Sequence, residues 1–123
     1  MTKVSFMIVD DAIFMRTLLR KIIEDVEGYT VVAEAGNGKE AIEAAKKSQP
    51  DIITLDITMP EMDGINALPK ILEVSPKSRV IVVSAMGQQS MVIDAIKMGA
   101  KDFIVKPFEK YKVYQTIQSV LAL

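Results

Sequence analysis

The sequence predicts an α/β protein, a doubly wound parallel sheet of five strands with five helices. Five short apolar segments rich in β-branched residues alternate along the chain with five longer segments whose apolar residues recur at helical spacing. Such alternation indicates one parallel sheet with helices on both faces, joined by right-handed crossovers. A length of 123 residues suits one domain with its own core.

The first strand is predicted over Val4–Val9, a mostly apolar run that leads into two acids, Asp10 and Asp11. From Phe14 the pattern becomes helical, and Gly28 suits a stop just after this helix. The stripe expected to face the core consists of Phe14, Leu18, Ile22 and Val26.

The second strand is shorter, over Thr30–Glu34, and we expect it at an edge of the sheet. The turn Gly36–Gly38 leads into a helix over Lys39–Ser48. The inward residues of this helix are expected to be Ala41, Ile42, Ala44 and Ala45.

The third strand, Ile52–Leu55, is apolar on both faces, which is typical of the middle of a parallel sheet. It runs directly into Asp56, and a carboxylate at the end of a buried strand is costly unless its charge is compensated. Pro60 then forces irregular backbone, and a loop is expected over Glu61–Gly64.

The third helix is expected over Asn66–Val74, with Asn66 as its N-cap. Under that assignment Pro69 is tolerated in the first turn, where N–H groups have no helical partner. Ser75 and Pro76 end the helix.

The fourth strand, Arg79–Val83, is the least ambiguous in the sequence and ends at Ser84. Gly87 then turns the chain into a helix over about Gln88–Met98, which Gly99 stops.

The last strand, Asp102–Val105, ends at Lys106 and Pro107. A final helix is expected from about Glu109 onward. Its apolar residues are spaced four apart, at Val113, Ile117 and Leu121.

Composition excludes several kinds of site. The chain has no Cys, and therefore no disulfide, thiolate metal site or Cys nucleophile. It has no His, the commonest general base and transition-metal ligand, so a metal must be bound through oxygen. The net charge of −1 gives no basic excess for nucleic acid, and no apolar segment reaches membrane-spanning length. We therefore expect a cytoplasmic protein that binds neither nucleic acid nor membrane.

Reactive side chains follow four of the five predicted strands. Because an open α/β sheet binds ligands outside the carboxyl ends of its strands, these side chains are expected to meet. The acids would repel each other without a cation, and among cations that prefer oxygen ligands Mg²⁺ suits the set best. A carboxylate beside Mg²⁺ can attack phosphorus and form an acyl phosphate, with a lysine and a hydroxyl on the phosphoryl oxygens. The residues concerned are Asp10, Asp11, Asp56, Ser84 and Lys106.

Four segments resemble the receiver domain of bacterial response regulators, and the resemblance covers essentially the whole chain. They are Met7–Asp11, Leu55–Gly64, Val83–Ala85 and Lys106–Phe108. The resemblance implies a flavodoxin-like sheet with strand order 2-1-3-4-5, and a receiver domain over residues 1–123 with no output domain. It also implies a two-component signalling switch, not an enzyme that turns over a substrate.

By position within these segments, the resemblance implies that Asp56 is the phosphoacceptor. Mg²⁺ would be held by Asp10, Asp11, Asp56 and the backbone carbonyl of Thr58. Lys106 would contact the phosphoryl group.

Ser84 would contact the phosphoryl group as well, and Phe103 would be the aromatic residue whose rotamer follows the switch. The peptide between Lys106 and Pro107 would be cis. Ser84 stands where Thr is common in the family, and Phe103 where Tyr is common. The second difference removes a phenol hydroxyl, and with it any signalling hydrogen bond from that position.

The implied phosphodonor is a sensor histidine kinase, because the chain itself has no His. The segment Glu34–Gly38 and the N-terminal third look closest to stand-alone chemotaxis regulators. A flagellar motor switch is then the expected target. A phosphatase is expected as a further partner, and the chain itself is expected to be a monomer. The alternative is a single-domain phosphorelay intermediate.

Two other functions fit parts of the sequence. Gly36–Ala41 matches a dinucleotide-binding fingerprint with Asp56 about 20 residues on, but the chain is short for the two-halved fold and the acidic pair would have no role. A Mg²⁺-dependent phosphatase with an aspartyl nucleophile would carry an Asp-x-Asp motif, and Thr58 stands at the position of its second acid.

Overall fold

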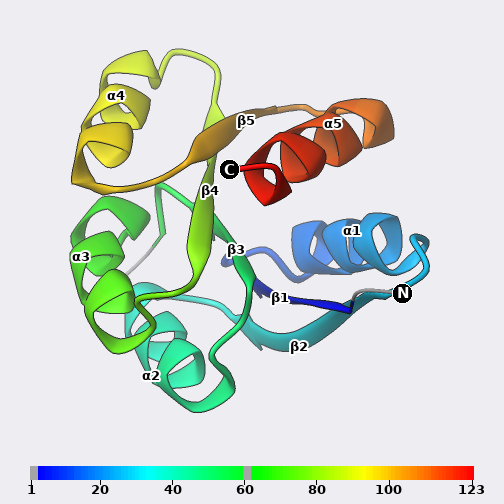
Figure 1. Cartoon of the computed structure of the whole chain (residues 1–123). Helices are drawn as coiled ribbons and strands as arrows, with labels where there is room; N and C mark the ends of the chain where they lie inside the picture. Colours follow the sequence, from blue (N-terminus) through cyan, green and yellow to red (C-terminus); the bar gives the residue numbers. More distant parts are fainter. Residues whose placement is uncertain (1–2, 60–61) are drawn as a thin grey trace.

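The computed structural model describes residues 3–59 and 62–123 of the chain. Within these residues the strands are β1 (Val4–Val9), β2 (Tyr29–Ala35), β3 (Ile52–Asp56), β4 (Arg79–Ala85) and β5 (Asp102–Lys106). The helices are α1 (Ile13–Glu24), α2 (Gly38–Ser48), α3 (Gly64–Val74), α4 (Gln89–Met98) and α5 (Lys110–Leu121). Figure 1 shows a central sheet with α2, α3 and α4 on one face and α1 and α5 on the other.

The predicted fold class and strand order are confirmed. Every strand pair is parallel, and the order across the sheet is β2-β1-β3-β4-β5. β3 occupies the middle of the sheet with all of its residues buried, and β2 forms an edge, as predicted. The observed starts of the helices and the bounds of the strands lie within about two residues of the predicted ones, the usual uncertainty at element ends.

Two apolar cores cover the two faces of the sheet, because successive strand residues point to opposite sides. In β3, Ile53 and Leu55 belong to the core under α2, α3 and α4, whereas Ile52 belongs to the core under α1 and α5. Thr54 and Asp56 follow Ile52 on this second face at intervals of two residues. Asp56 therefore ends a fully buried strand, and burial makes its charge costly.

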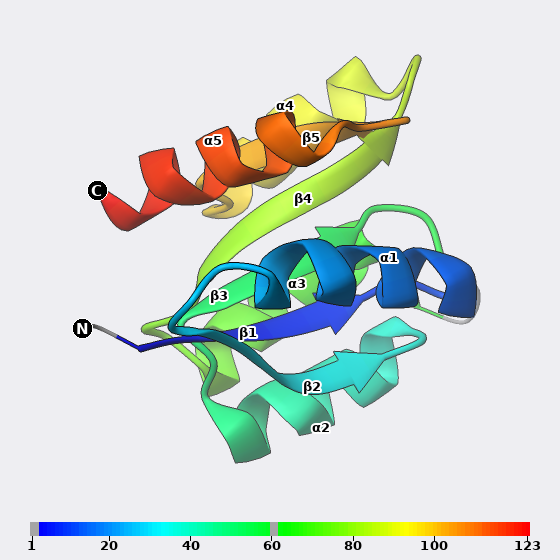
Figure 2. The same cartoon turned by 90° about the vertical axis from the view of Figure 1, so that its right-hand side faces the viewer.

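The inward stripe predicted for α1 is wrong at both ends. Phe14 is 76% exposed, and Val26 lies beyond the end of the helix at Glu24. Figure 2 shows that the first turn of α1 extends past the end of β1, so this turn lies beyond the sheet. Gly28 does not stop the helix either; with a φ of 92° it turns the chain into β2. The buried residues of α1 are Leu19, Ile22 and Ile23.

The predicted N-cap of α3 is also wrong. The N-cap is Asp63, whose Oδ1 accepts a hydrogen bond from the Asn66 N–H at 2.9 Å. The helix starts earlier than expected because the Gly64 N–H donates to the Ile57 carbonyl at 2.7 Å. A side chain at Gly64 would collide with the backbone of Asp56, so only glycine allows this close approach of α3 to β3.

With this earlier start, Pro69 lies in the interior of α3 rather than in its first turn. The helix continues through it at an exposed position, with one backbone hydrogen bond missing. Pro60 and Glu61, where the preceding loop was predicted to begin, lie outside the described residues.

The carboxyl ends of all the strands lie at one edge of the sheet because the strands are parallel. The peptide between Lys106 and Pro107, which follows β5 at this edge, is cis, as the family resemblance implied. Among the described helices, none has both the length and the apolar character needed to cross a membrane.

Candidate functional site

Three carboxylates meet at the carboxyl ends of β1 and β3. Asp10 and Asp11 follow β1 and Asp56 ends β3, and one carboxylate oxygen of each lies within 4.8 Å of the other two. Asp10 is 1% exposed and Asp56 is 6% exposed, whereas Asp11 faces solvent. The structure thus brings together the three acids singled out in the sequence.

Lys106, at the end of β5, compensates part of this charge. Its Nζ lies 3.0 Å from Asp10 Oδ2 and 3.3 Å from Asp56 Oδ2. The other oxygen of Asp10 accepts a hydrogen bond from the Ala12 N–H at 2.9 Å, and the Asp10 N–H donates to the Ala35 carbonyl at 3.0 Å. Three carboxylates and one ammonium leave two negative charges uncompensated.

The electrostatics of the site follow from burial and close charges. Burial raises the pKa of Asp56 above its ordinary value; the Lys106 ammonium opposes this rise, and the neighbouring Asp10 adds to it. Burial acts to lower the pKa of Lys106, but the hydrogen bond to Asp10 and the two carboxylate charges outweigh it, so the pKa of Lys106 is raised. Asp56 is therefore an acid whose negative charge is only partly compensated by the protein.

The donor set fits Mg²⁺. All three side chains offer hard oxygen ligands. The two uncompensated negative charges would be balanced by one divalent cation. Mg²⁺ is commonly held by one or two carboxylates together with waters and phosphate oxygens. The three oxygens lie close enough for the acids to share one cation, which Asp11 would approach from the solvent-exposed side of the site.

A glutamine joins the two loops that border Asp56. Gln88 Oε1 accepts a hydrogen bond from the Ala85 N–H at 2.7 Å, and Gln88 Nε2 donates to Thr58 Oγ1 at 2.8 Å. The Thr58 N–H in turn donates to Asp56 Oδ1 at 3.3 Å. Thr58 therefore lies beside Asp56, while the use of its backbone carbonyl as a metal ligand stays a prediction.

The two residues predicted to form the switch border one cavity. Ser84 is buried near the end of β4, and the cavity, of about 490 Å³, lies between β4, α4 and β5. Phe103 lines the same cavity from β5 and is 43% exposed. The apolar side chains around it include Met86, Val92, Ile93 and Val105.

Two residues at this edge were not identified from the sequence. Arg16 donates from Nη1 to the Asp10 carbonyl at 2.6 Å, and Gln88 makes the contacts described above. Neither belongs to a recognisable motif: Arg16 follows Asp10 by six residues, and Gln88 lies 30 residues after Thr58. Arg16 reaches its partner from α1 and Gln88 from the start of α4, so only the folded chain brings these partners together.

The apparent dinucleotide-binding fingerprint has a structural explanation. The Gly38 N–H donates to the Met62 carbonyl at 2.9 Å, and a Cβ at Gly38 would lie 2.6 Å from that oxygen. The Asn37 side chain caps α2 by accepting a hydrogen bond from the Glu40 N–H at 2.9 Å. Groups of the protein itself therefore occupy the start of α2, where a pyrophosphate would have to bind.

Comparison with known proteins gives a consistent picture. The family model of the response regulator receiver domain matches residues 6–118. The chemotaxis protein CheY of Thermotoga maritima is 56% identical over 114 residues, which are 93% of this chain and 94% of that protein. The chemotaxis protein CheY of Bacillus subtilis is 56% identical over 115 residues, which are 94% of this chain and 95% of that protein.

Solved structures extend the similarity to the fold. A chain in the CheX-CheY-BeF3-Mg+2 complex from Borrelia burgdorferi matches with a TM-score of 0.91 and 42% identity, covering 98% of this chain and 90% of that chain. The response regulator domain of Thermotoga maritima CheB matches with a TM-score of 0.89 and 34% identity, covering 98% of each chain. Sequence and fold thus agree over nearly the whole length.

Proposed function

The chain belongs to the response regulator receiver family, and from this premise we propose that Asp56 accepts a phosphoryl group from another molecule in a Mg²⁺-dependent reaction. The position of Asp56 carries the proposal. It is a buried carboxylate at the end of the central strand, with the Lys106 ammonium at 3.3 Å and two further acids within 4.8 Å. In this reading the chain is a switch that catalyses only its own phosphorylation and dephosphorylation.

In the phosphorylation step, a carboxylate oxygen of Asp56 attacks the phosphorus of the donor. An oxygen–phosphorus bond forms, the bond from phosphorus to the leaving group breaks, and the leaving group departs with the electron pair. The product is an acyl phosphate on Asp56. Because the chain has no His, a phosphohistidine donor must belong to a separate sensor kinase.

The other residues of the site would neutralise and orient the phosphoryl group. Asp10, Asp11, Asp56 and the Thr58 carbonyl would hold Mg²⁺, which when bound would offset the negative charge of the acids and of the phosphoryl oxygens. Lys106 already lies beside two of the acids and would donate a charge-assisted hydrogen bond to a phosphoryl oxygen.

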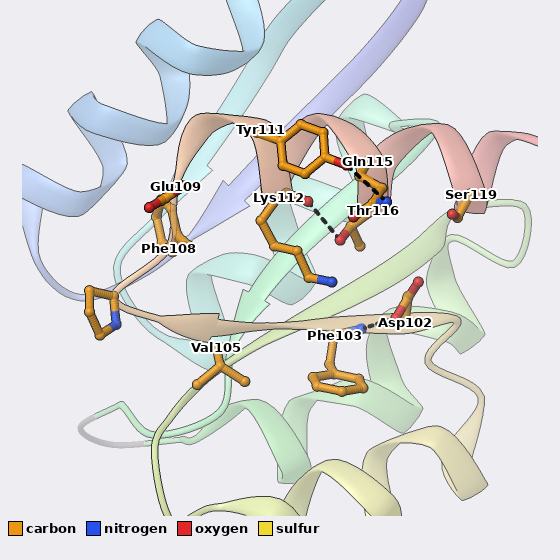
Figure 3. Close-up of a pocket in the computed structure, with 11 residues that line it drawn as sticks. Asp102, Phe103, Val105, Phe108, Glu109, Tyr111, Lys112, Gln115, Thr116 and Ser119 are labelled. Carbon is orange, nitrogen blue, oxygen red and sulfur yellow. Dashed lines mark hydrogen bonds between the residues drawn. The ribbon is translucent and has the colours of Figure 1, made fainter.

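Ser84 and Phe103 would couple phosphorylation of Asp56 to the binding of a partner. A phosphoryl group adds nearly two negative charges and three strong acceptors, so it would draw the Ser84 hydroxyl toward it. That movement opens space in the cavity that Ser84 and Phe103 share, and Phe103 is the large side chain placed to fill it. Figure 3 shows Phe103 and Val105 projecting from β5 on the side away from α5.

The energies are of the right size for a switch. Moving a two-state equilibrium fully from one side to the other takes about 5.5 kcal/mol. Two hydrogen bonds to a charged phosphoryl group, from Lys106 and Ser84, contribute roughly 1.5–3 kcal/mol each. The remodelled face would be the one formed by α4, β5 and α5.

The relatives support chemotaxis as the pathway. Two that are 56% identical to this chain carry the name chemotaxis protein CheY, and the chain from Borrelia burgdorferi is described in complex with CheX. We infer a chemotaxis sensor kinase as donor, a flagellar motor switch as target and a phosphatase that resets the monomeric receiver. We infer a cytoplasmic setting from the similarity to these chemotaxis proteins. A pull-down with and without beryllofluoride separates this pathway from a phosphorelay, in which the target would be another phosphotransfer protein.

Mass spectrometry tests the phosphoacceptor. After treatment with acetyl phosphate and Mg²⁺, we expect one hydroxylamine-labile phosphate on the wild-type chain and none on Asp56→Asn. Asp94→Asn, at an exposed position of α4, is the matched control and should be labelled like the wild type. The same modification on Asp56→Asn would refute the assignment.

A phosphatase with an aspartyl nucleophile would behave differently, by releasing phosphate continuously from phosphate esters. We expect no such turnover, because Thr58 stands where that enzyme would carry its second acid. Phosphate release that continues well beyond one equivalent per chain would favour the phosphatase.

A further inference from the structure

Asp10 and Asp11 are adjacent in the chain but are held in different ways. Asp10 is buried, and its two carboxylate oxygens accept hydrogen bonds from Lys106 and from the Ala12 N–H. Asp11 is exposed and belongs to none of the ion pairs found among the described residues. The direction of the Asp11 side chain therefore depends on the peptide that joins the two acids.

Arg16 holds that peptide. Its Nη1 donates to the Asp10 carbonyl oxygen at 2.6 Å, and its Nε donates to Glu34 Oε1 at 3.0 Å. Because the guanidinium is planar and rigid, its bond to Glu34 on β2 fixes the direction of its bond to Asp10. Glu34 also accepts a hydrogen bond from Arg20 Nε at 2.8 Å, but through its other oxygen, so the Arg16 contact has an acceptor of its own. The Arg16 side chain thus connects Glu34 on the edge strand β2 to the backbone between Asp10 and Asp11.

Neither charge balance nor helix formation explains this contact. Lys106 already pairs with the Asp10 carboxylate, and Glu34 already balances the charge of Arg16. The start of α1 does not depend on the Arg16 side chain, because the Arg16 backbone N–H makes its own bond to the Ala12 carbonyl at 3.1 Å. What the side chain adds is a fixed orientation of the peptide between the two acids.

We propose that Arg16 is a positioning residue of the metal site, which orients Asp11 toward the ion through the Asp10 carbonyl. The proposal rests on the Mg²⁺ site proposed above, and it adds a residue that touches neither the ion nor the phosphoryl group. Loss of such an outer-shell contact typically weakens metal binding about 10–100-fold. Simple electrostatics predicts the opposite sign, since removing a positive charge near a cation site strengthens cation binding.

Titration of the isotope-labelled, metal-free chain with MgCl2 tests the proposal, with NMR shifts followed at the backbone amides of Asp10, Asp11 and Thr58. We expect Arg16→Gln to raise the Kd for Mg²⁺ about tenfold. The matched control is Arg20→Gln, which removes the other ion pair of Glu34 without touching Asp10. Its Kd should stay within about twofold of the wild type, and the same spectra show whether each variant is folded.

A Kd for Arg16→Gln that is unchanged or lower than that of the wild type overturns the positioning role. An equal weakening in Arg20→Gln also overturns it, because the effect would then come from general packing of α1 against β2. Failure of the metal site itself would look different. In that case the wild type would show no saturable shift at Asp11, or Asp11→Ala would bind Mg²⁺ as tightly as the wild type.

Discussion

The two sides of the candidate site differ in how firmly their residues are held. On the β1 side, Asp10 is 1% exposed, and hydrogen bonds fix its N–H, its carbonyl and both oxygens of its carboxylate. On the β5 side, Phe103 is 43% exposed beside a cavity of about 490 Å³ that separates it from α4. The carboxyl-end edge of the sheet is therefore closely packed at β1 and borders a cavity at β4 and β5.

This difference matches the two tasks of a phosphorylated switch. Binding a metal and a phosphoryl group favours side chains that are positioned before the ligand arrives. Transmitting the signal to a partner needs an element that can adopt two discrete arrangements. A close-packed interior does not allow this, but a cavity beside a large side chain does. We therefore interpret the β1 side as the fixed half of the site and the β4–β5 side as the half that moves.

The largest predicted difference between the two halves is in the stability lost when a phenylalanine is replaced. Phe6 on β1 is fully buried and packs against Tyr29 with ring centroids 5.1 Å apart. We expect Phe6→Ala to lower the free energy of unfolding by about 3–5 kcal/mol, and Phe103→Ala to lower it by less than about 1 kcal/mol. Urea denaturation measures both. If Phe6→Ala does not fold, Phe6→Leu should still lose more stability than Phe103→Leu, and equal losses would remove the contrast.

The next effect concerns the charge that ends the central strand. The pKa of Asp56 is raised in the folded state. At a pH between the ordinary carboxyl pKa and this raised one, Asp56 is therefore protonated in the folded chain and ionised in the unfolded chain. Metal-free stability should therefore fall as pH rises from the ordinary carboxyl pKa through the raised one. Asp56→Asn should lack this fall and melt a few degrees higher at neutral pH, as a gain of about 1 kcal/mol would produce.

Thermal melts in EDTA from about pH 4 to about pH 8 measure this difference. The range excludes the contribution of Lys106, whose raised pKa removes stability only at alkaline pH. Parallel pH profiles for the wild type and Asp56→Asn would show that burial of this carboxylate carries no cost.

An effect of similar size is expected from the link between the two loops. Movement of Ser84 toward a phosphoryl group also moves the adjacent Ala85 N–H, which Gln88 holds. Loss of the Gln88 contacts should favour the rearranged loops by about 1 kcal/mol, so Gln88→Ala should bind beryllofluoride roughly fivefold more tightly. The exposed neighbour Gln89 provides the control, and an unchanged affinity in Gln88→Ala would mean that the loops are not restrained there.

The smallest effect lies on the strand between the halves. Among the buried polar side-chain atoms of the described residues, Thr54 Oγ1 is without a hydrogen-bond partner. We expect Thr54→Val to raise the free energy of unfolding by up to about 1 kcal/mol, because it removes an unsatisfied hydroxyl. Thr116→Val is the control: its hydroxyl donates to the Lys112 carbonyl at 2.9 Å, so this variant should be destabilised. A loss of stability in both variants would indicate that Thr54 has a bound partner.

Local pattern was enough to predict the alternating elements and the acid cluster. A continuous apolar run places β3 in the middle of the sheet, and the carboxyl ends of parallel strands share one edge, where the acids were expected to meet. The strand order that puts β1 beside β3 was implied by the family resemblance. The switch pair came from the family resemblance, since periodicity alone does not distinguish Phe103 from a core residue.

What could not be predicted depends on tertiary geometry. Helical periodicity assumes a sheet beneath every turn, and Phe14 lies on a turn that extends beyond the sheet. The start of α3 was decided by the bond from the Gly64 N–H to β3, which outweighs any local preference for Asn66 as the cap. The contacts of Arg16 and Gln88 with the site form only in the folded chain, and the sequence carries no spacing that signals them.

Fluorine NMR compares the two halves in one sample. The chain has four Phe residues, so fluorophenylalanine labelling gives four resonances, which single Phe→Leu variants assign. Spectra are recorded before and after addition of beryllofluoride and Mg²⁺. The resonance of Phe103 should move to a new position, because its side chain fills the space that Ser84 vacates. The resonance of Phe6, in the packed core, should stay in place. An unchanged Phe103, or a shift of Phe6 as large as that of Phe103, would contradict the division of this receiver into a fixed and a moving half.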